Sequence, residues 1–250
     1  MKVCLKKKDL NLVVEIGNTA LKAAWTEGTT LGKTYRYQGE RRIDFITGIT
    51  SKEKPEVMAV SSVYEISRQD EARLKEECQT LIILDSAHPE VALQNGLPQY
   101  ISYDRVAALI AAKRLFKNMG CTVFDFGTTL TIDYIDSLGN YEGGNISPGC
   151  RTRFKALGRY SKSLPILDTP AEITPLGHSV SSAIESGVIS GIMFEIQAYI
   201  DRKPGNVVIF TGGDAIYFVK KMKNSIFVVC NLVLIGLALI TEDYVSDKEN

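Results

Sequence analysis

Two short segments of the sequence place an acidic residue, a glycine and small polar residues in the same order. The first is Glu15-Ile16-Gly17-Asn18-Thr19, and the second, Asp125-Phe126-Gly127-Thr128-Thr129, begins 110 residues later (from 15 to 125). The glycine allows the backbone to approach a ligand closely or to take a positive φ. Backbone N–H groups and small polar side chains in such a turn can bind phosphate, and Lys22 adds a cation. The acid at each strand end is placed where a metal-associated carboxylate would lie.

Taken alone, such a segment is usually only a plain hairpin, in which the acid caps the turn. The repetition favours a functional interpretation, because both copies are followed by alternating residues and then by a glycine-bearing turn. Self-similarity at about half the chain length predicts two related domains that face each other. Two such hairpins on opposite walls of a cleft would hold the phosphates of a nucleotide from both sides.

A pair of glycines marks a second kind of candidate site. Thr211-Gly212-Gly213-Asp214 follows a short apolar strand predicted over 207–210. Glycines directly after a buried strand would let an adenine or ribose lie against the backbone. The alternative is that they only allow a strand and a helix to pack closely.

Ser102-Tyr103-Asp104-Arg105 stands where a long irregular segment enters a strong helical pattern. Asp104 could simply cap that helix and interact with its dipole. In the functional alternative it is a general base that takes a proton from a substrate hydroxyl. Arg105 would then hold a carboxylate or a phosphate through two parallel hydrogen bonds.

The elements that must position these residues can be predicted from hydrophobic periodicity. In the first half we expect strands over 10–16, 21–26, 31–37, 57–63 and 80–84, with helices over 41–51, 66–78 and 103–119. In the second half we expect strands between 121 and 141, a glycine-rich loop over 142–149, a helix over 151–160, a linker or lid over 164–177, a long helix over 179–201, strands over 207–210 and 226–229, and a last helix to about 244.

Composition excludes several classes of protein. With 250 residues, 45% hydrophobic and 23% charged, the chain is typical of a soluble globular protein of one or two domains. A formal net charge of zero gives no sign of a nucleic-acid-binding surface. The five cysteines show no Cys-x-x-Cys spacing, which argues against a zinc site or a disulfide framework and favours reduced thiols in a cytoplasmic protein. The apolar run 226–240 is too short to cross a membrane, and residues 1–10 lack the apolar core of a signal peptide.

The ordered set of motifs resembles that of the type III pantothenate kinases, in the acetate kinase/sugar kinase/Hsp70/actin superfamily. The family's Asp-x-Gly-Asn-Thr-x-x-Lys corresponds to Glu15–Lys22, its Gly-x-Asp-Arg to Ser102–Arg105, and its Asp-x-Gly-Thr-Ala-x-Thr to Asp125–Thr131. Its Gly-Gly-x-Ile-x-Pro-Gly is matched in full by Gly143–Gly149. The resemblance covers nearly the whole chain.

The resemblance implies an α/β fold of duplicated actin-like ATPase (ribonuclease H-like) domains, with mixed sheets flanked by helices and a nucleotide cleft between them. We expect the domains to be 1–117 and 118–250. The implied activity is ATP-dependent phosphorylation of pantothenate to 4'-phosphopantothenate, the first step of coenzyme A biosynthesis, by a cytoplasmic homodimer. The implied cofactors are Mg²⁺ and a monovalent cation, K⁺ or NH₄⁺, and neither a nucleic acid nor a membrane is an expected partner.

The same resemblance, together with the residue chemistry above, assigns the expected site residues. Asp104 would be the catalytic base, Asp125 would bind the monovalent cation, and pantothenate would be held by Ser102, Tyr103, Asp104, Arg105 and Val180. ATP would be bound by Glu15, Ile16, Gly17, Asn18, Thr19, Ala20, Leu21, Lys22, Thr128, Gly212 and Gly213.

Three departures from the family's pattern matter for the site. Glu15 stands in place of Asp, and its extra methylene moves the carboxylate by about an ångström, enough to matter in a positioned site. Ser102 replaces a glycine. Val180 replaces a threonine that contacts pantothenate in the family, and valine cannot donate that hydrogen bond. These departures motivate two alternatives: a catalytically weakened nucleotide-binding regulatory paralogue, and a kinase for another small hydroxy acid.

Overall fold

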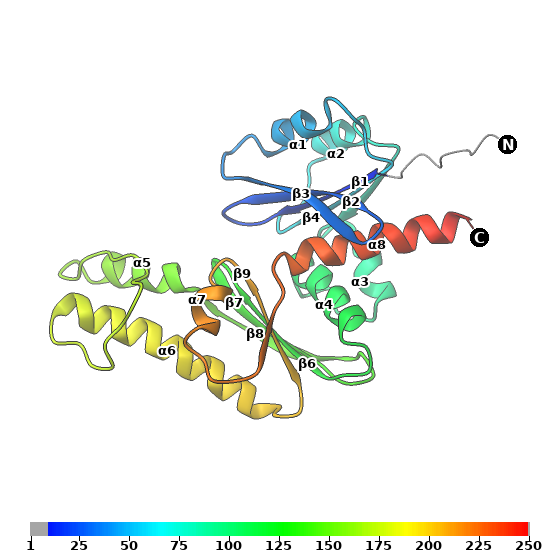
Figure 1. Cartoon of the computed structure of the whole chain (residues 1–250). Coiled ribbons are helices and arrows are strands. Elements are labelled where there is room, and N and C mark those ends of the chain that lie inside the picture. Colours follow the sequence, from blue (N-terminus) through cyan, green and yellow to red (C-terminus); the bar gives the residue numbers. More distant parts are fainter. Residues whose placement is uncertain (1–9, 250) are drawn as a thin grey trace. The chain divides into compact units, whose positions relative to one another are not determined.

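A computed structural model describes residues 10–249, which form two compact units (Figure 1). The first unit contains the residues up to Ala112 together with those from Leu232 onward, and the second runs from Lys113 to Asn231. Each unit is built on one five-stranded mixed sheet with helices. Among residues 10–249, no helix combines the length and the apolar character needed to cross a bilayer.

The first unit has the strand order β3-β2-β1-β4-β5. β1, β2 and β3 pair antiparallel, whereas β1, β4 and β5 pair parallel. Antiparallel neighbours need only short turns, but parallel neighbours need crossovers, and α1 and α2 supply them. The elements are β1 (Leu10–Ile16), β2 (Leu21–Glu27), β3 (Thr30–Tyr37), α1 (Arg42–Thr50), β4 (Val57–Ser62), α2 (Arg68–Lys75), β5 (Thr80–Leu84), α3 (Glu90–Gln94), α4 (Tyr103–Leu115) and α8 (Leu232–Glu249).

Both faces of the central strands β1 and β4 are covered. Alternate residues such as Leu12, Val14 and Met58 pack with apolar side chains of α1 and α2 in one cluster. The intervening residues are buried as well and belong to the opposite face, where α8 packs against β1 and β4. Glu15 and Ser61 lie in register on that second face.

α8 belongs to the first unit, whereas the expected domains, 1–117 and 118–250, placed it in the second. The sequence pattern assigned the C-terminal segment to the second domain, but α8 packs on the sheet of the first unit. The reason is that β1 and β4 are largely apolar on both faces and need a second helical layer. The apolar first half of α8 provides that layer, since Leu232–Leu234 and Leu237–Ile240 are all buried.

The second unit repeats the topology of the first. Its strand order is β10-β9-β6-β7-β8, with β10, β9 and β6 parallel and β6, β7 and β8 antiparallel. The elements are β6 (Cys121–Phe126), β7 (Thr129–Ile135), β8 (Tyr141–Pro148), α5 (Cys150–Tyr160), α6 (Val180–Arg202), β9 (Val207–Gly212), α7 (Ala215–Val219) and β10 (Ile226–Val228). The predicted duplication and the mixed sheets flanked by helices are therefore confirmed.

The predicted glycine-rich loop over 142–149 was wrong. Most of it is strand β8, which pairs with β7 from Ile135 opposite Tyr141 to Thr129 opposite Pro148. Glycines and a proline are poor strand formers, but at the edge of a sheet pairing with a single neighbour is enough.

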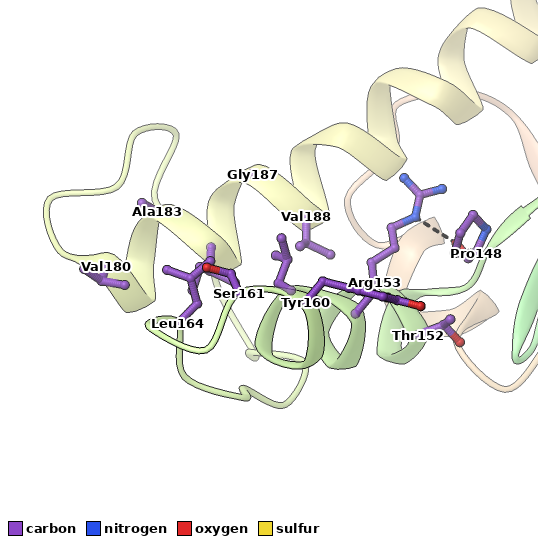
Figure 2. Close-up of a pocket in the computed structure, with 13 residues that line it drawn as sticks. Pro148, Thr152, Arg153, Tyr160, Ser161, Leu164, Val180, Ala183, Gly187 and Val188 are labelled. Carbon is purple, nitrogen blue, oxygen red and sulfur yellow. Dashed lines mark hydrogen bonds between the residues drawn. The ribbon is translucent and has the colours of Figure 1, made fainter.

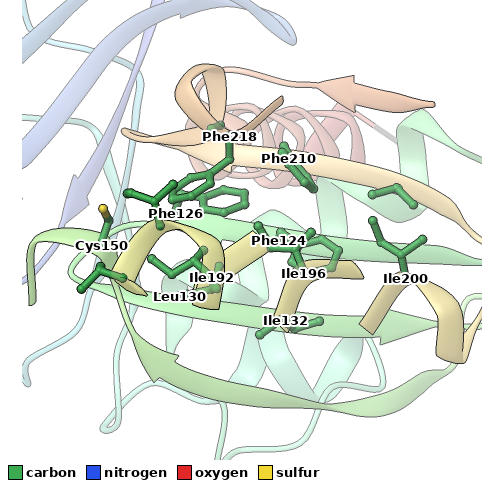
Figure 3. Close-up of a cluster of buried hydrophobic side chains, with 14 of the residues drawn as sticks. Phe124, Phe126, Leu130, Ile132, Cys150, Ile192, Ile196, Ile200, Phe210 and Phe218 are labelled. Atoms are coloured by element: carbon green, nitrogen blue, oxygen red, sulfur yellow. The ribbon is translucent and has the colours of Figure 1, made fainter. Parts of the chain in front are cut away.

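Aromatic rings hold the core of the second unit together at the carboxyl ends of β6 and β9 (Figure 3). The ring centroids of Phe126 and Phe210 are 4.7 Å apart, and those of Phe126 and Phe218 are 5.1 Å apart. Ile192 and Ile196, four residues apart on α6, are buried in the same cluster. This packing fixes the ends of β6 and β9, where Asp125 and Gly212 lie.

Candidate functional site

The turn between β1 and β2 is a tight, exposed loop. The N–H of Gly17 donates a hydrogen bond of 3.0 Å to the carbonyl of Ala20, and Ile16 pairs with Leu21. Asn18 and Thr19 at its tip are exposed. Gly17 does not take a positive φ; a side chain there would instead crowd the Ala20 carbonyl, at 3.2 Å from its Cβ. The predicted strand–turn–strand is confirmed.

Glu15 is a buried carboxylate held by Lys22 across the hairpin. Lys22 Nζ lies 3.0 Å from Glu15 Oε2 and 3.3 Å from Oε1, and Glu15 is only 9% exposed. Burial raises the pKa of Glu15; Lys22 opposes this effect, and the charge of Asp104 adds to the increase. Two predicted site residues almost ninety positions apart (15 and 104) therefore lie within electrostatic range of one another.

Asp104 lies in the first turn of α4, as the sequence predicted. Its Oδ1 accepts a hydrogen bond of 2.8 Å from the backbone N–H of Arg105. The carbonyl of Ser102 accepts the first helical bond, from Val106 N–H at 3.0 Å. Arg105 is 6% exposed and Tyr103 is also buried, whereas Asp104 and Ser102 are partly exposed. Asp104 is thus the accessible acid of this segment, beside a buried guanidinium.

Three further residues at this edge of the sheet, Arg42, Tyr64 and Ser61, were not among those predicted from the sequence. Arg42 donates from Nη1 to the Gly17 carbonyl at 3.0 Å and from Nη2 to the Asn18 carbonyl at 3.2 Å. Tyr64 donates its hydroxyl to Asn18 Oδ1 at 3.0 Å. Ser61 is buried, and its Oγ has no hydrogen-bond partner within residues 10–249.

A weak signal for Ser61 does exist in the sequence. It belongs to a polar pair that closes the apolar strand β4, and carboxyl ends of parallel strands meet at one edge of a sheet. For Arg42 we find no such signal, because its contacts depend on where α1 begins relative to the turn.

The second acidic motif has the same strand–turn–strand arrangement. Asp125 in β6 is in register with Thr131 of β7 and Thr211 of β9. The N–H of Gly127 donates to the carbonyl of Thr129 at 3.0 Å. The carbonyl of Thr128 accepts from Gly149 N–H at 3.0 Å and from Thr152 Oγ1 at 2.6 Å. The turn is therefore tied to the junction of β8 and α5.

The paired glycines at the end of β9, Gly212 and Gly213, have different surroundings. Gly212 has a φ of +91°, and a Cβ there would lie 2.6 Å from the backbone N and O of Phe126 and still closer to Asp125 Oδ1. A Cβ on Gly213 would meet only the Phe126 carbonyl, at 3.9 Å. Gly212 thus allows close packing against strand β6, whereas the alternative left open by the sequence was packing of a strand against a helix, and Gly213 is exposed. Burial raises the pKa of the neighbouring Asp214, and the charge of Arg151 opposes this increase.

Val180 lies in a different environment from the other candidates of the second unit. It is the first residue of α6, is 57% exposed, and borders an apolar groove of about 970 Å³ between α5 and α6. Figure 2 shows Val180 and Leu164 at one end of the groove and Pro148 and Thr152 at the other. The groove is lined by Pro148, Thr152, Arg153, Ala156, Leu157, Tyr160, Ser161, Leu164, Val180, Ala183, Ile184, Gly187 and Val188.

The predicted site residues therefore form separate groups. Glu15–Lys22 and Ser102–Arg105 share the first unit, whereas Asp125, Thr128, Gly212, Gly213 and Val180 belong to the second. Over residues 10–249, no three side chains of histidine, cysteine, aspartate or glutamate gather into a ready-made metal site.

Comparison with known proteins adds independent findings. A sequence model of the family described as type III pantothenate kinase matches residues 11–202. A type III pantothenate kinase from Bacteroides fragilis is 34% identical over 233 residues, which cover 91% of this chain and 96% of that protein. One from Phocaeicola vulgatus is 36% identical over 234 residues, with the same two coverages of 91% and 96%.

Solved structures agree on the fold. A Baf family protein from Campylobacter jejuni superposes with a TM-score of 0.65 at 20% identity, covering 94% of this chain and 99% of its own. MreB 5 of Spiroplasma citri bound to AMPPNP superposes with a TM-score of 0.54 at 13% identity, covering 98% and 99%. At these identities the similarity shows the fold alone, and it confirms the predicted actin-like class.

Proposed function

The chain belongs to the type III pantothenate kinase family, and we propose which of its residues perform the ATP-dependent phosphorylation of pantothenate. In this reaction the hydroxyl oxygen of pantothenate bonds to the γ-phosphorus of ATP while the bond to the bridging oxygen breaks. The products are ADP and 4'-phosphopantothenate, and the reaction is the first step of coenzyme A biosynthesis. Phosphoryl transfer depends mostly on positioning and on neutralising charge.

The observation that carries our assignment is the proximity of three charged groups in the first unit. Lys22 of β2 forms an ion pair of 3.0 Å with Glu15 of β1, and the charge of Asp104 of α4 acts to raise the pKa of Glu15. We assign the residues from Glu15 to Lys22 to the ATP phosphates, with Lys22 supplying positive charge. Lys22 is paired with Glu15, but its side chain is 32% exposed. A change of side-chain conformation would therefore let it reach a phosphate.

We assign Asp104 as the general base that takes the proton of the pantothenate hydroxyl. It is partly exposed at the start of α4, and a carboxylate accepts such a proton when it lies within hydrogen-bond reach. Ser102, Tyr103 and Arg105 would hold the substrate, with the Arg105 guanidinium facing its carboxylate.

ATP and a divalent metal accompany the activity of a kinase, and the metal neutralises phosphate charge. Mg²⁺ fits a site without three clustered protein ligands, because it commonly uses one or two carboxylates together with phosphate oxygens and water. For the monovalent cation, K⁺ or NH₄⁺, we assign Asp125. Its carboxylate shares a face of the sheet with Thr131 and Thr211, an oxygen-rich set that suits a hard cation.

The remaining assignments concern the nucleotide in the second unit. We assign Thr128 to the ATP phosphates, because its turn repeats the geometry of the first hairpin. Gly213 is exposed, and a Cβ there would make only one ordinary contact, with the Phe126 carbonyl, whereas Gly212 lies directly against β6. This arrangement leaves bare backbone on which an adenine or ribose could rest.

The test of the assignment to Asp104 is Asp104→Asn. Asparagine keeps the Oδ1 acceptor for Arg105 N–H, so the start of α4 is preserved while the base is removed. In an ADP-release assay with pantothenate, ATP, Mg²⁺ and K⁺, we expect kcat to fall by roughly 10²–10⁴-fold. Asp70→Asn, which changes another first-turn acid in α2, is the matched control and should keep wild-type kcat.

The outcomes separate the candidate functions. Wild-type turnover no higher than that of Asp104→Asn would contradict an active pantothenate kinase. ATP binding without turnover of any small hydroxy acid would favour the regulatory alternative. Turnover of a different hydroxy acid, in preference to pantothenate, would favour a kinase of changed substrate.

We also propose that the protein is a homodimer that uses the groove between α5 and α6. The lining side chains are mostly apolar, and exposed apolar patches of this kind mark interaction sites. Ala183→Glu, in the groove, should shift the mass measured by light scattering from dimer to monomer. Ala198→Glu, at an exposed position of the same helix outside the groove, should not; equal masses for both variants would contradict the assignment.

A cytoplasmic location belongs to the same proposal. Within the described chain, Cys78, Cys121, Cys150 and Cys230 are free thiols, as is usual in a reducing compartment.

A further inference from the structure

The turn between β1 and β2 (residues 17–20), which we assign to the ATP phosphates, accepts hydrogen bonds from two side chains of other elements. Arg42, the first residue of α1, donates to the carbonyls of Gly17 at 3.0 Å and Asn18 at 3.2 Å. Tyr64, just after β4, donates to Asn18 Oδ1 at 3.0 Å. The Arg42 guanidinium also lies 5.7 Å from the centroid of the Tyr64 ring. The two side chains therefore form one cluster around Asn18, which we call the clamp.

These contacts determine where the amide groups of the turn point. In a planar trans peptide the C=O and N–H bonds point in opposite directions, and every described peptide bond is trans. The Gly17 carbonyl shares a peptide with the N–H of Asn18, and the Asn18 carbonyl shares one with the N–H of Thr19. When Arg42 binds both carbonyls, both N–H groups are directed away from it, toward the opposite side of the turn. Successive N–H groups on one side of a turn form a concavity that binds anions.

We propose that Arg42 and Tyr64 are positioning residues that pre-form the phosphate-binding turn for ATP. The proposal rests on the assignment of this turn to the ATP phosphates. Asn18 and Thr19 are exposed at the tip, so without the clamp the turn would have to be ordered when ATP binds, which weakens affinity. The planar guanidinium suits this role because its nitrogens reach two carbonyls at once, which a lysine ammonium does less well.

A purely architectural role for Arg42, anchoring α1 to the sheet, is less consistent with the packing. α1 is already secured by Ile46, which is fully buried, and by Phe45, whose ring stacks on Tyr37 with centroids 4.6 Å apart. α1 is also tied to α2 by an ion pair of 2.6 Å between Arg73 and Asp44. The contacts of Arg42 with the turn add little to the attachment of α1, so their main effect is to fix the conformation of the turn.

The test compares variants of the clamp with a matched arginine. Arg42→Gln should raise KM for ATP about tenfold or more, because two charge-assisted hydrogen bonds are lost. Arg42→Lys should recover only part of this loss, and Tyr64→Phe should raise KM for ATP roughly threefold. KM for pantothenate and the melting temperature should stay near wild type. Arg73→Gln, which removes an arginine bound to α1 but not to the turn, should leave KM for ATP unchanged.

Calorimetric titration with Mg²⁺-ATP in the absence of pantothenate gives a second measurement, which does not require turnover. The Kd of Arg42→Gln should rise by the same factor as KM, even if the chain proved inactive on pantothenate, so failure of the proposed function would be recognised separately. The proposal is overturned if Arg42→Gln binds ATP like the wild type, if KM for both substrates rises together, or if Arg73→Gln has the same effect.

Discussion

The two adjacent glycines at the end of β9, Gly212 and Gly213, should respond differently to substitution by alanine. Gly212 has a φ of +91°, and an alanine Cβ there would lie 2.6 Å from backbone atoms of Phe126. Alanine at this φ costs about 1–2 kcal/mol. Relieving the overlap requires β6 or β9 to shift, which costs about 1–3 kcal/mol more, as overpacking does.

We therefore expect Gly212→Ala to lower the free energy of unfolding by about 2–5 kcal/mol, a large part of the ~5–15 kcal/mol typical of a native protein. Gly213→Ala is the matched control, because its Cβ would be 3.9 Å from the Phe126 carbonyl, an ordinary contact. We expect that variant to stay within about 0.5 kcal/mol of wild type. If adenosine rests on Gly213, the Gly213→Ala variant should keep its stability but have a raised KM for ATP.

The assay is urea unfolding followed by two probes. Far-UV circular dichroism follows both units, whereas the fluorescence of Trp25, the single tryptophan, follows the first unit. Gly212→Ala should move the dichroism transition to lower urea. The reasoning would be refuted if Gly212→Ala unfolded like the wild type, or if Gly213→Ala were equally destabilised.

Two further predictions concern the positions that depart from the family's motifs. Burial raises the pKa of Glu15 above its usual 4.5, so the folded chain loses stability as the pH rises from 4.5 through the folded pKa, by up to ~1.4 kcal/mol per pH unit. Glu15→Gln should remove this loss. In thermal melts from pH 4 to 8, the melting temperature of the variant should rise relative to that of the wild type over that window. Melting temperatures that change with pH in parallel would contradict a raised pKa of Glu15. Val180→Thr should lower KM for pantothenate roughly threefold to tenfold, because the new hydroxyl adds one hydrogen bond; an unchanged KM would place Val180 outside the substrate pocket. Val180 is 57% exposed, so the fold should be unaffected.

Local patterns were sufficient to predict much of the fold. The two hairpins follow from alternation and turn chemistry, which involve residues close in sequence, and both are confirmed. The repeated acid-x-Gly motif predicted the duplication, which the matching strand orders of the two sheets confirm. The pairing of Glu15 with Lys22 was not predicted, although it too depends on local structure, since a short turn fixes the register of its strands.

Other features depended on contacts between distant residues. The glycine-rich segment 142–149 has little strand propensity of its own, and it becomes β8 only because β7 offers a free edge. The C-terminal helix joins the first unit because β1 and β4 expose an apolar face that needs covering. Neither effect can be seen from the composition of the segment concerned.

The candidate site divides in the same way. The sequence alone predicted Glu15, Lys22 and Asp104 as candidates by their motifs, because turns and helix starts require particular residue types at particular positions. Only the tertiary structure placed Asp104 near Glu15 and brought Arg42 and Tyr64 onto the turn. The physical reason is that these contacts depend on strand order and on the crossover helices, which bring residues 20 to 90 positions apart to one edge of a sheet.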